Sequence, residues 1–544
     1  MSNVTIFRDL QLPPANKSRR GYAMGLFLVV LTVMTTTIVM MLSTAAKEAR
    51  NTAQTSELTK ARALASSSLD DFYARLQTTP DIIDDLQRGT SQPIVSDMIL
   101  TGSSSRPWHY NERGARVSCA GTDNLYRACY FLEIAFITAS GETRPDALEV
   151  TANVRYDCRG SVDRCRTVTF EQRIRAWQFT DFLFYTQYNV VSPSLRSVFP
   201  SRSIVQSNGV DPCAVPASGR VSSIGQSDCP TVAYTDNDKV TGPVYTADDF
   251  IVVCGRPSNI FTATSGGQTR VYARATNGQV LRNASTLRGD TCPTDWDPAS
   301  FGTTLSAVLR LPPGRTTFNQ AELRATTSGS ALRATGSTVS VVFNGNQVSV
   351  SGAGSTNSLT LSPLMKVITV DGDVELSGEI DGRVTVFASG NATIVGDLKY
   401  SNKTSDTGLG DVLGVNSIGD IIIEPISPKA SDCTAANQPI RVVNALLVSL
   451  NGTVRTANLN VPTSPSITST GCAPKLEFFG AMATKYQGVF GLYDSFSSQV
   501  LRGYSKNFSH DDRSTRSGVF LPPYLVTPVG LQWVRVDIAE VFDN

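Results

Sequence analysis

The first pattern in the chain is a long apolar run close to its start. From Gly21 to Ala46 no residue is charged, and residues 22–42 are apolar apart from a few threonines. At 1.5 Å per residue a helix of this length crosses the ~30 Å hydrocarbon core of a bilayer, for which about 20 residues are needed. Lys17, Arg19 and Arg20 precede the run. The short N-terminal piece is therefore expected to stay in the cytoplasm, and the rest of the chain to be exported.

The apolar run continues as an amphipathic pattern. No Pro or Gly interrupts residues 43–77, and apolar residues recur there at three- and four-residue spacing, as one face of a helix requires. The residues of this face are Leu58, Ala61, Leu64, Ala65, Leu69, Phe72 and Leu76. One helix over residues 22–78, about 80 Å long, is predicted. Its first half would lie in lipid or in a filament, and its second half would pack under a globular head.

Residues 79–190 have the character of β-structure. Three runs with alternating or β-branched residues follow one another at 128–141, 147–158 and 164–176, and each ends at a turn-rich or Cys-containing stretch. They predict an antiparallel meander after the helix. The fold class expected from the order of elements is therefore α+β, with a long N-terminal helix and an antiparallel sheet.

From about residue 191 to 500 the chain is rich in Ser, Thr, Gly and Asn. The clearest β-runs are 338–353, 367–398, 418–425 and 442–450, separated by G-D, D-G, N-G and S-G pairs. Strands this short need to stack in rungs, each pairing with equivalents above and below, which favours a large β-solenoid domain. A β-sandwich is the competing fold. Residues 501–544 form a closing segment with a last strand at 531–538.

Composition limits the chemistry. The 48 Lys and Arg residues nearly balance the 47 Asp and Glu residues of this 544-residue chain. This balance excludes a protein that coats nucleic acid with its whole surface, and any charged binding surface must be local. The chain has two histidines, His109 and His510. So few histidines disfavour a Ser-His-Asp catalytic site and a zinc site with mainly imidazole ligands. His510 has acidic neighbours but no nucleophile nearby, and is interpreted as a hydrogen-bonded structural residue. No cofactor or metal site is predicted.

All ten cysteines follow the apolar run. An even number on the exported side indicates structural disulfides in an oxidising compartment, and neighbours in the sequence can pair, although one sequence does not give the connectivity. No C-x-x-C motif occurs, which disfavours redox chemistry and zinc ribbons. The disulfide candidates are Cys119, Cys129, Cys158, Cys165, Cys213, Cys229, Cys254, Cys292, Cys433 and Cys472.

Arginines gather in one stretch of the predicted solenoid. Arg270, Arg274, Arg282 and Arg288 face a single acid, Asp290, and the excess continues with others that acids offset. The arginine fork suits phosphate, so this stretch is a candidate DNA-binding surface. The alternative is an ordinary solvated face, because arginine outnumbers lysine throughout the chain.

The sequence around residue 21 resembles the class III leader of type IV pilins. A basic leader, Gly21 and an aromatic residue, Tyr22, precede the apolar helix. The resemblance implies cleavage after Gly21 by a prepilin peptidase, methylation of the new amino terminus, and a leader peptide of residues 1–21. A secretory signal fits less well because the apolar run is too long and no small-x-small site closes it. A plain transmembrane anchor is the other alternative.

The resemblance is strongest to large minor pilins with a PilX-type N-terminus, and it extends to residues 502–505, 509–513 and 522–524 of the closing segment. Most pilins carry a glutamate five residues into the mature chain, where this chain has Leu26. A subunit without that carboxylate can still sit first, so the resemblance implies a place at the pilus tip. The alternative is that assembly tolerates Leu26 anywhere along the filament. Other minor and major pilins are the implied partners, with the inner membrane before assembly.

Several functions stay open at this point. Large competence minor pilins with an enlarged head suggest a tip subunit that helps to initiate assembly and captures DNA for natural transformation. A pilus-tip adhesin for surfaces or glycans, and a pseudopilin at the tip of a type II secretion system, are alternatives. A calcium-dependent polysaccharide lyase would use Asp371, Asp373 and Asp381 with Arg383. Because D-G pairs are ordinary turn chemistry, no enzyme is predicted.

Overall fold

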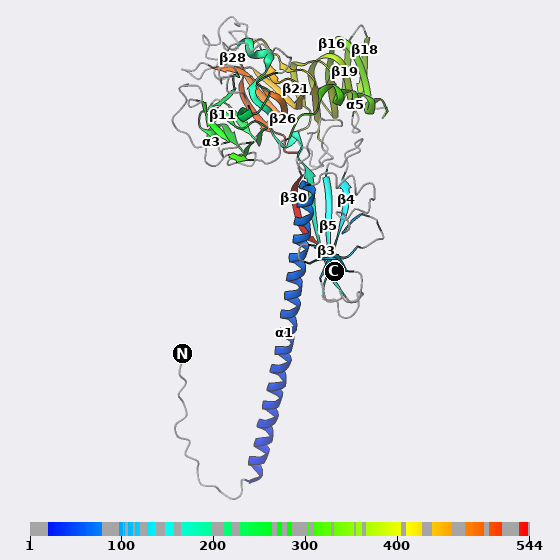
Figure 1. Cartoon of the computed structure of the whole chain (residues 1–544), viewed down its shortest axis with the longest axis vertical. Helices are drawn as coiled ribbons and strands as arrows, with labels where there is room; N and C mark the ends of the chain where they lie inside the picture. Colours follow the sequence, from blue (N-terminus) through cyan, green and yellow to red (C-terminus); the bar gives the residue numbers. More distant parts are fainter. Residues whose placement is uncertain are drawn as a thin grey trace.

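The computed structural model places a helix, a small sheet and a large β-rich head along one long axis (Figure 1). It describes residues 20–78 and, with gaps, residues 97–541. The longer gaps are 120–127, 138–146, 157–164, 199–210, 220–228, 285–301, 427–437, 460–473 and 514–532.

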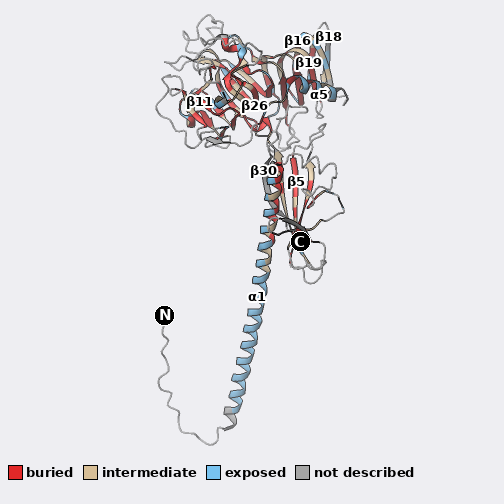
Figure 2. Ribbon diagram, in the orientation of Figure 1, coloured by how far each residue is buried: buried red, intermediate tan, exposed pale blue. Residues whose placement is uncertain are grey.

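Helix α1 (Arg20–Thr78) is one uninterrupted helix of 59 residues, as the pattern predicts. Its first half contacts nothing else in the described chain: from Met24 to Leu42 the large apolar side chains are exposed (Figure 2). This half is long and apolar enough to cross a membrane. Four threonines of this stretch donate their hydroxyl protons to carbonyls of the preceding turn, which removes polar groups from the helix surface.

The second half of α1 packs against a seven-stranded sheet. Ala61, Ala65, Leu69, Phe72 and Leu76 are buried against strand residues, and Leu58 and Leu64 pack at the margin of the same core. All seven residues of the predicted helix face therefore meet the sheet.

The sheet is antiparallel except for one short edge strand. The three predicted runs form β4 (Cys129–Ile137), β5 (Ala147–Tyr156) and β6 (Arg166–Ala176), which pair in order as a meander. β2 (His109–Glu112) and β3 (Ala115–Ser118) form a hairpin beside β4, while β1 (Met98–Leu100) runs parallel to β4.

The last strand of the chain returns to this sheet. β30 (Trp533–Val541) pairs antiparallel with β6. Since β6 ends at Ala176, everything between these two strands is an insertion into the small sheet, and the head is joined to it by two neighbouring strands.

Most of the head is made of parallel strands. One row begins with β7 (Phe184–Val191), β10 (Val244–Thr246), β13 (Val271–Ala273) and β15 (Gly302–Thr304). The same row continues on the other side of β7 through the following strands: β26 (Lys475–Gln487), β24 (Ile440–Ser449), β22 (Val412–Ser417), β20 (Arg383–Ala388), β19 (Lys366–Ile380) and β16 (Ala331–Gly345).

Further parallel rows complete the head. One contains β21 (Ala392–Tyr400), β23 (Ile421–Ile423) and β25 (Val454–Thr456). Another joins β29 (Ser505–His510), β9 (Lys239–Thr241) and β12 (Phe261–Thr262), and a third joins β8 (Ala233–Thr235), β11 (Ile251–Cys254) and β14 (Leu281–Asn283). Three pairings in the described part of the head are antiparallel: β16 with β17 (Gln347–Gly352), β17 with β18 (Ser355–Thr360), and β27 (Gly491–Tyr493) with β28 (Val500–Gly503).

The short helical elements of the head are η5 (Phe179–Asp181), η6 (Pro193–Val198), η7 (Ala217–Gly219), α3 (Pro257–Ile260) and α5 (Gly314–Thr327).

The chain enters the stack of strands in its middle. β7 lies between β26 and β10, and β29 pairs with both β26 and β9. Strands from the start and the end of the head sequence are therefore neighbours. β7 begins at Phe184 and β29 ends at His510, so the head stack starts before residue 191 and ends beyond residue 500.

A connection on the outside links the two halves of the stack. The Tyr185 hydroxyl donates to the Leu309 carbonyl oxygen (2.6 Å), and the Tyr245 hydroxyl accepts from the Leu309 amide (3.3 Å). From there the chain enters α5, where Phe318, only 1 % exposed, packs edge-on against Phe387 of β20. This segment covers a second apolar core on the outer face of the stack.

Glycines and short polar residues form a corner that repeats from rung to rung. The Asp373 carboxylate accepts from the Asn391 amide (2.6 Å), the Asn391 side-chain oxygen accepts from the Asp420 amide (2.9 Å), and the Asp420 carboxylate accepts from the Thr453 amide (3.0 Å). A glycine precedes each of these positions. A side chain on the glycine before Asn391, Asp420 or Thr453 would overlap the polar residue of the preceding rung.

Disulfide bonds close two of the loops. Cys119 is bonded to Cys129 and Cys213 to Cys229, so both of these bonds join neighbours in the sequence. Cys165 and Cys254 are also disulfide-bonded. The remaining candidates, Cys158, Cys292, Cys433 and Cys472, lie outside the described residues.

Candidate functional site

The processing residues lie at the beginning of α1. Gly21 and Tyr22 belong to its first turn, and the leader residues before Arg20 lie outside the described residues. Leu26 points into solvent with 67 % of its surface exposed, in a stretch where the neighbouring apolar side chains are exposed as well. An exposed apolar helix of this length needs lipid or other protein around it.

A buried ion pair fixes α1 to the sheet. The Arg75 guanidinium binds the Asp97 carboxylate through two hydrogen bonds of 2.9 and 3.0 Å, and the Tyr130 hydroxyl of β4 donates to the same carboxylate (3.1 Å). Asp97 is fully buried. Burial and the Asp97 charge raise the pKa of Tyr130 far above its usual value, so its hydroxyl stays protonated and able to donate.

The structure separates the four candidate arginines. Arg270 and Arg274 are exposed and flank β13, at opposite ends of the strand. Arg282 belongs to β14, in a different sheet, and is half-buried with its guanidinium 4.1 Å from the centre of the Phe250 ring. Arg288 and Asp290 lie outside the described residues. Among the described candidates, Arg270 and Arg274 alone therefore lie next to the same strand.

Two of the more distant arginines are held by acids. Arg333 Nε lies 2.7 Å from Glu322 Oε1, and Arg315 Nη1 lies 3.3 Å from Asp371 Oδ1. Both arginines are largely exposed, which makes these ion pairs ordinary features of a solvated surface.

The candidate lyase residues are engaged in the stack. Asp371 accepts from the Ser389 hydroxyl (2.7 Å) as well as pairing with Arg315, and Asp373 belongs to the repeated corner. Asp381 is exposed and Arg383 is buried. Within the described residues, no group of three or more His, Cys, Asp or Glu is arranged to hold a metal ion.

His510 lies at the junction between the small sheet and the head. Its Nε2 atom is 2.7 Å from the Thr180 carbonyl oxygen, just after the end of β6. Beside it, Arg175 of β6 pairs with the buried Asp181 carboxylate (2.6 Å). Burial lowers the pKa of His510, although Thr180 and nearby acids oppose this effect. These contacts support the interpretation of His510 as a structural residue.

Replacing His510 with glutamine is expected to reduce the sensitivity of the head to acid. A histidine whose pKa is lowered by folding favours the folded state above its unfolded pKa of about 6.5, and this stability is lost as the pH falls through that value. Thermal melting between about pH 7.5 and pH 5 measures the effect, with a smaller slope expected for the variant. Identical slopes would contradict the assignment.

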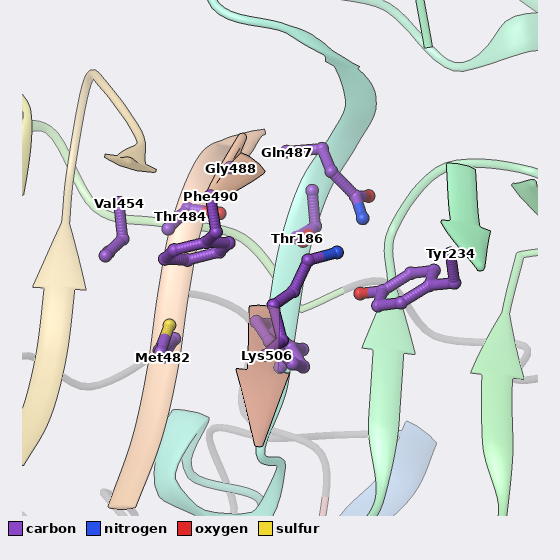
Figure 3. Close-up of a pocket in the computed structure, with 10 residues that line it drawn as sticks. Thr186, Tyr234, Val454, Met482, Thr484, Gln487, Gly488, Phe490 and Lys506 are labelled. Carbon is purple, nitrogen blue, oxygen red and sulfur yellow. The ribbon is translucent and has the colours of Figure 1, made fainter. Parts of the chain in front are cut away.

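A small pocket lies where the two halves of the head meet (Figure 3). Its lining comes from both halves and includes Thr186, Tyr234, Gln487 and Lys506, as the close-up shows. The Lys506 ammonium is buried and paired with Asp238 (2.8 Å). The pocket has room for about one water molecule, so it is a packing feature of the seam.

Comparisons with known proteins give little beyond these observations. No protein-family model matches the chain, and no curated protein matches its sequence. The chain is similar to the crystal structure of the competence-associated pilin ComZ from Thermus thermophilus, with 11 % identity over 89 % of this chain and 97 % of that chain, and a TM-score of 0.27. At this TM-score the two structures superpose poorly, and the likeness by itself assigns nothing to this chain.

Sequence reasoning missed the ion pair of Arg75 and Asp97. Arg75 lies among the apolar residues of the predicted helix face, and Asp97 follows a segment without a clear pattern. A charged residue next to an apolar helix face was the one available signal, but its partner could not be chosen from the sequence.

Proposed function

We propose that this chain is a minor pilin of a type IV pilus, with the head displayed beyond the filament. The observation that carries this proposal is the division of α1, whose first half is apolar and exposed while its second half packs under an antiparallel sheet. A tether for a soluble domain needs only the apolar half. Because the same helix continues into the core of the sheet, the stem and the sheet move as a single rigid unit, which suits a filament subunit.

The head is proposed to be a β-solenoid. Its rows pair in parallel, and the corner of Asp373, Asn391 and Asp420 repeats from one rung to the next. A stack of this kind is stiff because each rung is bonded to its neighbours along several rows. A stiff head would hold a binding surface away from the cell.

Leu26 supports a place at the pilus tip. Its side chain has no charge to offer the amino terminus of a neighbouring subunit, so this chain would lack one attraction for docking beneath an existing subunit but could still be the first in the filament. Initiation of assembly is therefore proposed for this chain. Attachment to surfaces or glycans, a place elsewhere in the filament and a place in a type II secretion system remain alternatives that a gene deletion can distinguish.

DNA is the proposed ligand of the head. Arg270 and Arg274 are exposed on both sides of β13, and the aromatic ring of Tyr272 lies between them in the sequence. Exposed guanidinium groups bind phosphates without regard to base sequence. Arg282 is left out of the revised surface because it stacks on Phe250.

Replacing Arg270 and Arg274 together by serine is expected to weaken duplex binding by the purified chain in detergent. Loss of two phosphate contacts reduces the slope of log affinity against log salt by about 2. The matched control replaces Arg315 and Arg333, which are also exposed but paired with acids, and should leave the slope unchanged. An unchanged slope in the first variant removes this surface from the proposal.

Deletion of the gene tests the function as a whole, with piliation, transformation and attachment scored separately. Loss of transformation with intact pili supports DNA capture, and loss of pili as well supports initiation of assembly. Complementation with the Arg270 and Arg274 double variant should restore pili but not transformation. Cells that lose only attachment would identify an adhesin, and cells that lose nothing would contradict both proposed roles.

A further inference from the structure

We propose that the head binds a calcium ion where β7, η7 and the loop between β10 and β11 meet. The oxygens that carry the proposal belong to Asn189 and Asp249. The inference does not depend on the filament role, since it concerns only how the head is held together.

Three segments far apart in the sequence are tied together at this place. The Asp248 carboxylate accepts from the Asn189 amide (2.9 Å) at the end of β7 and from the Ala217 amide (2.7 Å) at the start of η7. The Asp249 Oδ2 atom accepts from the Ser218 amide (2.5 Å). Two adjacent carboxylates, only 2 % and 5 % exposed, therefore hold η7 against the stack.

One oxygen of Asp249 has no partner in the described part of the chain. Its Oδ1 atom is buried and forms no hydrogen bond, and Asp249 has no ion pair among the described residues. A buried carboxylate oxygen without a donor or a cation is expensive, because ionised groups lose their hydration on burial. A bound cation would remove this cost.

Asn189 provides the second, independent observation. Its side-chain Nδ2 donates to the Phe250 carbonyl oxygen (3.0 Å), which fixes the orientation of the amide and leaves Oδ1 as the free end. Asn189 is 1 % exposed, and its Oδ1 has no hydrogen-bond partner among the described residues. Since its main-chain amide also binds Asp248, the whole residue lies against 248–250, the segment that carries the unpartnered oxygen of Asp249.

The donor set selects a hard cation. Carboxylate, amide and carbonyl oxygens are the ligands of calcium, which accepts irregular arrangements of six to eight oxygens, whereas magnesium requires a nearly ideal octahedron. Both oxygens of Asp248 already accept backbone amides, so the ligands with a free oxygen are the Asp249 carboxylate and the Asn189 amide. A site with so little charge is expected to have the affinity of extracellular calcium modules, in the range of about 0.1–1 mM.

Calcium at this place would lock a disulfide loop to the stack. Cys213 and Cys229 are buried against Val190 of β7, and η7 lies between these two cysteines in the sequence. The loop is already closed by the disulfide and packs on Val190, and the two carboxylates add polar contacts from η7 to the segment before β11. A cation shared between Asn189 and Asp249 would add a bond between the rungs themselves.

The test uses the purified full chain in detergent, after dialysis against EDTA, with calorimetric titration and thermal melting in CaCl2 or MgCl2 up to about 10 mM. Calcium should bind saturably and raise the melting temperature by a few degrees, and magnesium should do much less. Asp249→Asn should weaken calcium binding at least tenfold. The control is Asp381→Asn, which removes the same charge from an exposed position and should bind calcium as the wild type does.

Asn189→Asp keeps the test decisive if Asp249→Asn does not fold. The extra charge should tighten calcium binding several-fold, while the loss of the Nδ2 donor should lower the melting temperature in EDTA. A wild-type chain that neither binds calcium nor melts later in its presence overturns the proposal, and the carboxylates then serve only to bind backbone amides. Equal calcium affinities for wild type, Asp249→Asn and Asn189→Asp overturn it as well.

Discussion

Replacing Asp97 with alanine is expected to lower the free energy of unfolding of the helix–sheet unit by about 3–5 kcal/mol. The change leaves the Arg75 guanidinium without its two short hydrogen bonds, in a position where its side chain is only 9 % exposed. It also removes the acceptor of the Tyr130 hydroxyl. A buried charge that loses its partner destabilises a protein far more than the intact pair stabilises it.

Asp71 offers the matched control. It lies 3.1 Å from Arg75 Nε, one helical turn earlier, but its side chain is 45 % exposed. Asp71→Ala should therefore change the free energy of unfolding by at most about 1 kcal/mol. Denaturant unfolding of the purified chain, followed by a probe on α1, distinguishes the two variants. Equal effects would mean that Asp97 does not fix the helix to the sheet.

The second large effect is expected at Gly480, where two strands of the head approach closely. Gly480 lies in β26 opposite Ala445 of β24 and has a φ of 155°. A side chain at this position would overlap the Ala445 carbonyl oxygen, a backbone atom that cannot move without breaking the ladder. Gly480→Ala should destabilise the head by more than about 4 kcal/mol, which is exceptional for so small a change.

Gly345 provides the comparison for this variant. Its φ of 61° is also in the left-handed region, but nothing lies within 4 Å of the position that a side chain would take. Gly345→Ala should cost about 1–2 kcal/mol, from backbone strain alone. Melting temperatures of the two variants measure the difference. A Gly480→Ala head as stable as the Gly345→Ala head would contradict the close approach of β24 and β26.

Elements with a strong local period could be predicted from the sequence. The face of α1 from Leu58 to Leu76 is one example, because a spacing of three and four residues has one structural meaning when no Pro or Gly interrupts it. The meander of β4, β5 and β6 is another. Its strands are consecutive, so their pairing requires no information from distant regions of the chain.

The arrangement of the head could not be predicted in the same way. The corner glycines Gly390, Gly419 and Gly452 are unevenly spaced, because the loops between rungs differ in length, so no repeat length is visible in the sequence. The pairing of β7 with β26 joins strands on opposite sides of the head sequence. Nothing local to either strand specifies such a partner.

The arginine surface shows a different limit. Neighbouring positions in a stretch of short strands can lie at different sheets: Arg274 follows β13 of the large sheet, whereas Arg282 belongs to β14 of the three-stranded sheet. A cluster of charges in the sequence is therefore not a cluster in space. Conversely, residues that are distant in the sequence can meet in space: Asn189 is hydrogen-bonded to the segment that contains Asp249.

The central claim is that α1 builds a filament and does not merely anchor a domain. The most direct measurement is the N-terminal sequence of the protein recovered from sheared pili, together with its position by labelling of the head. The account predicts a chain that begins at Tyr22 and a label at the ends of filaments. A chain that keeps residues 1–21 and stays dispersed in the inner membrane of piliated cells would contradict it.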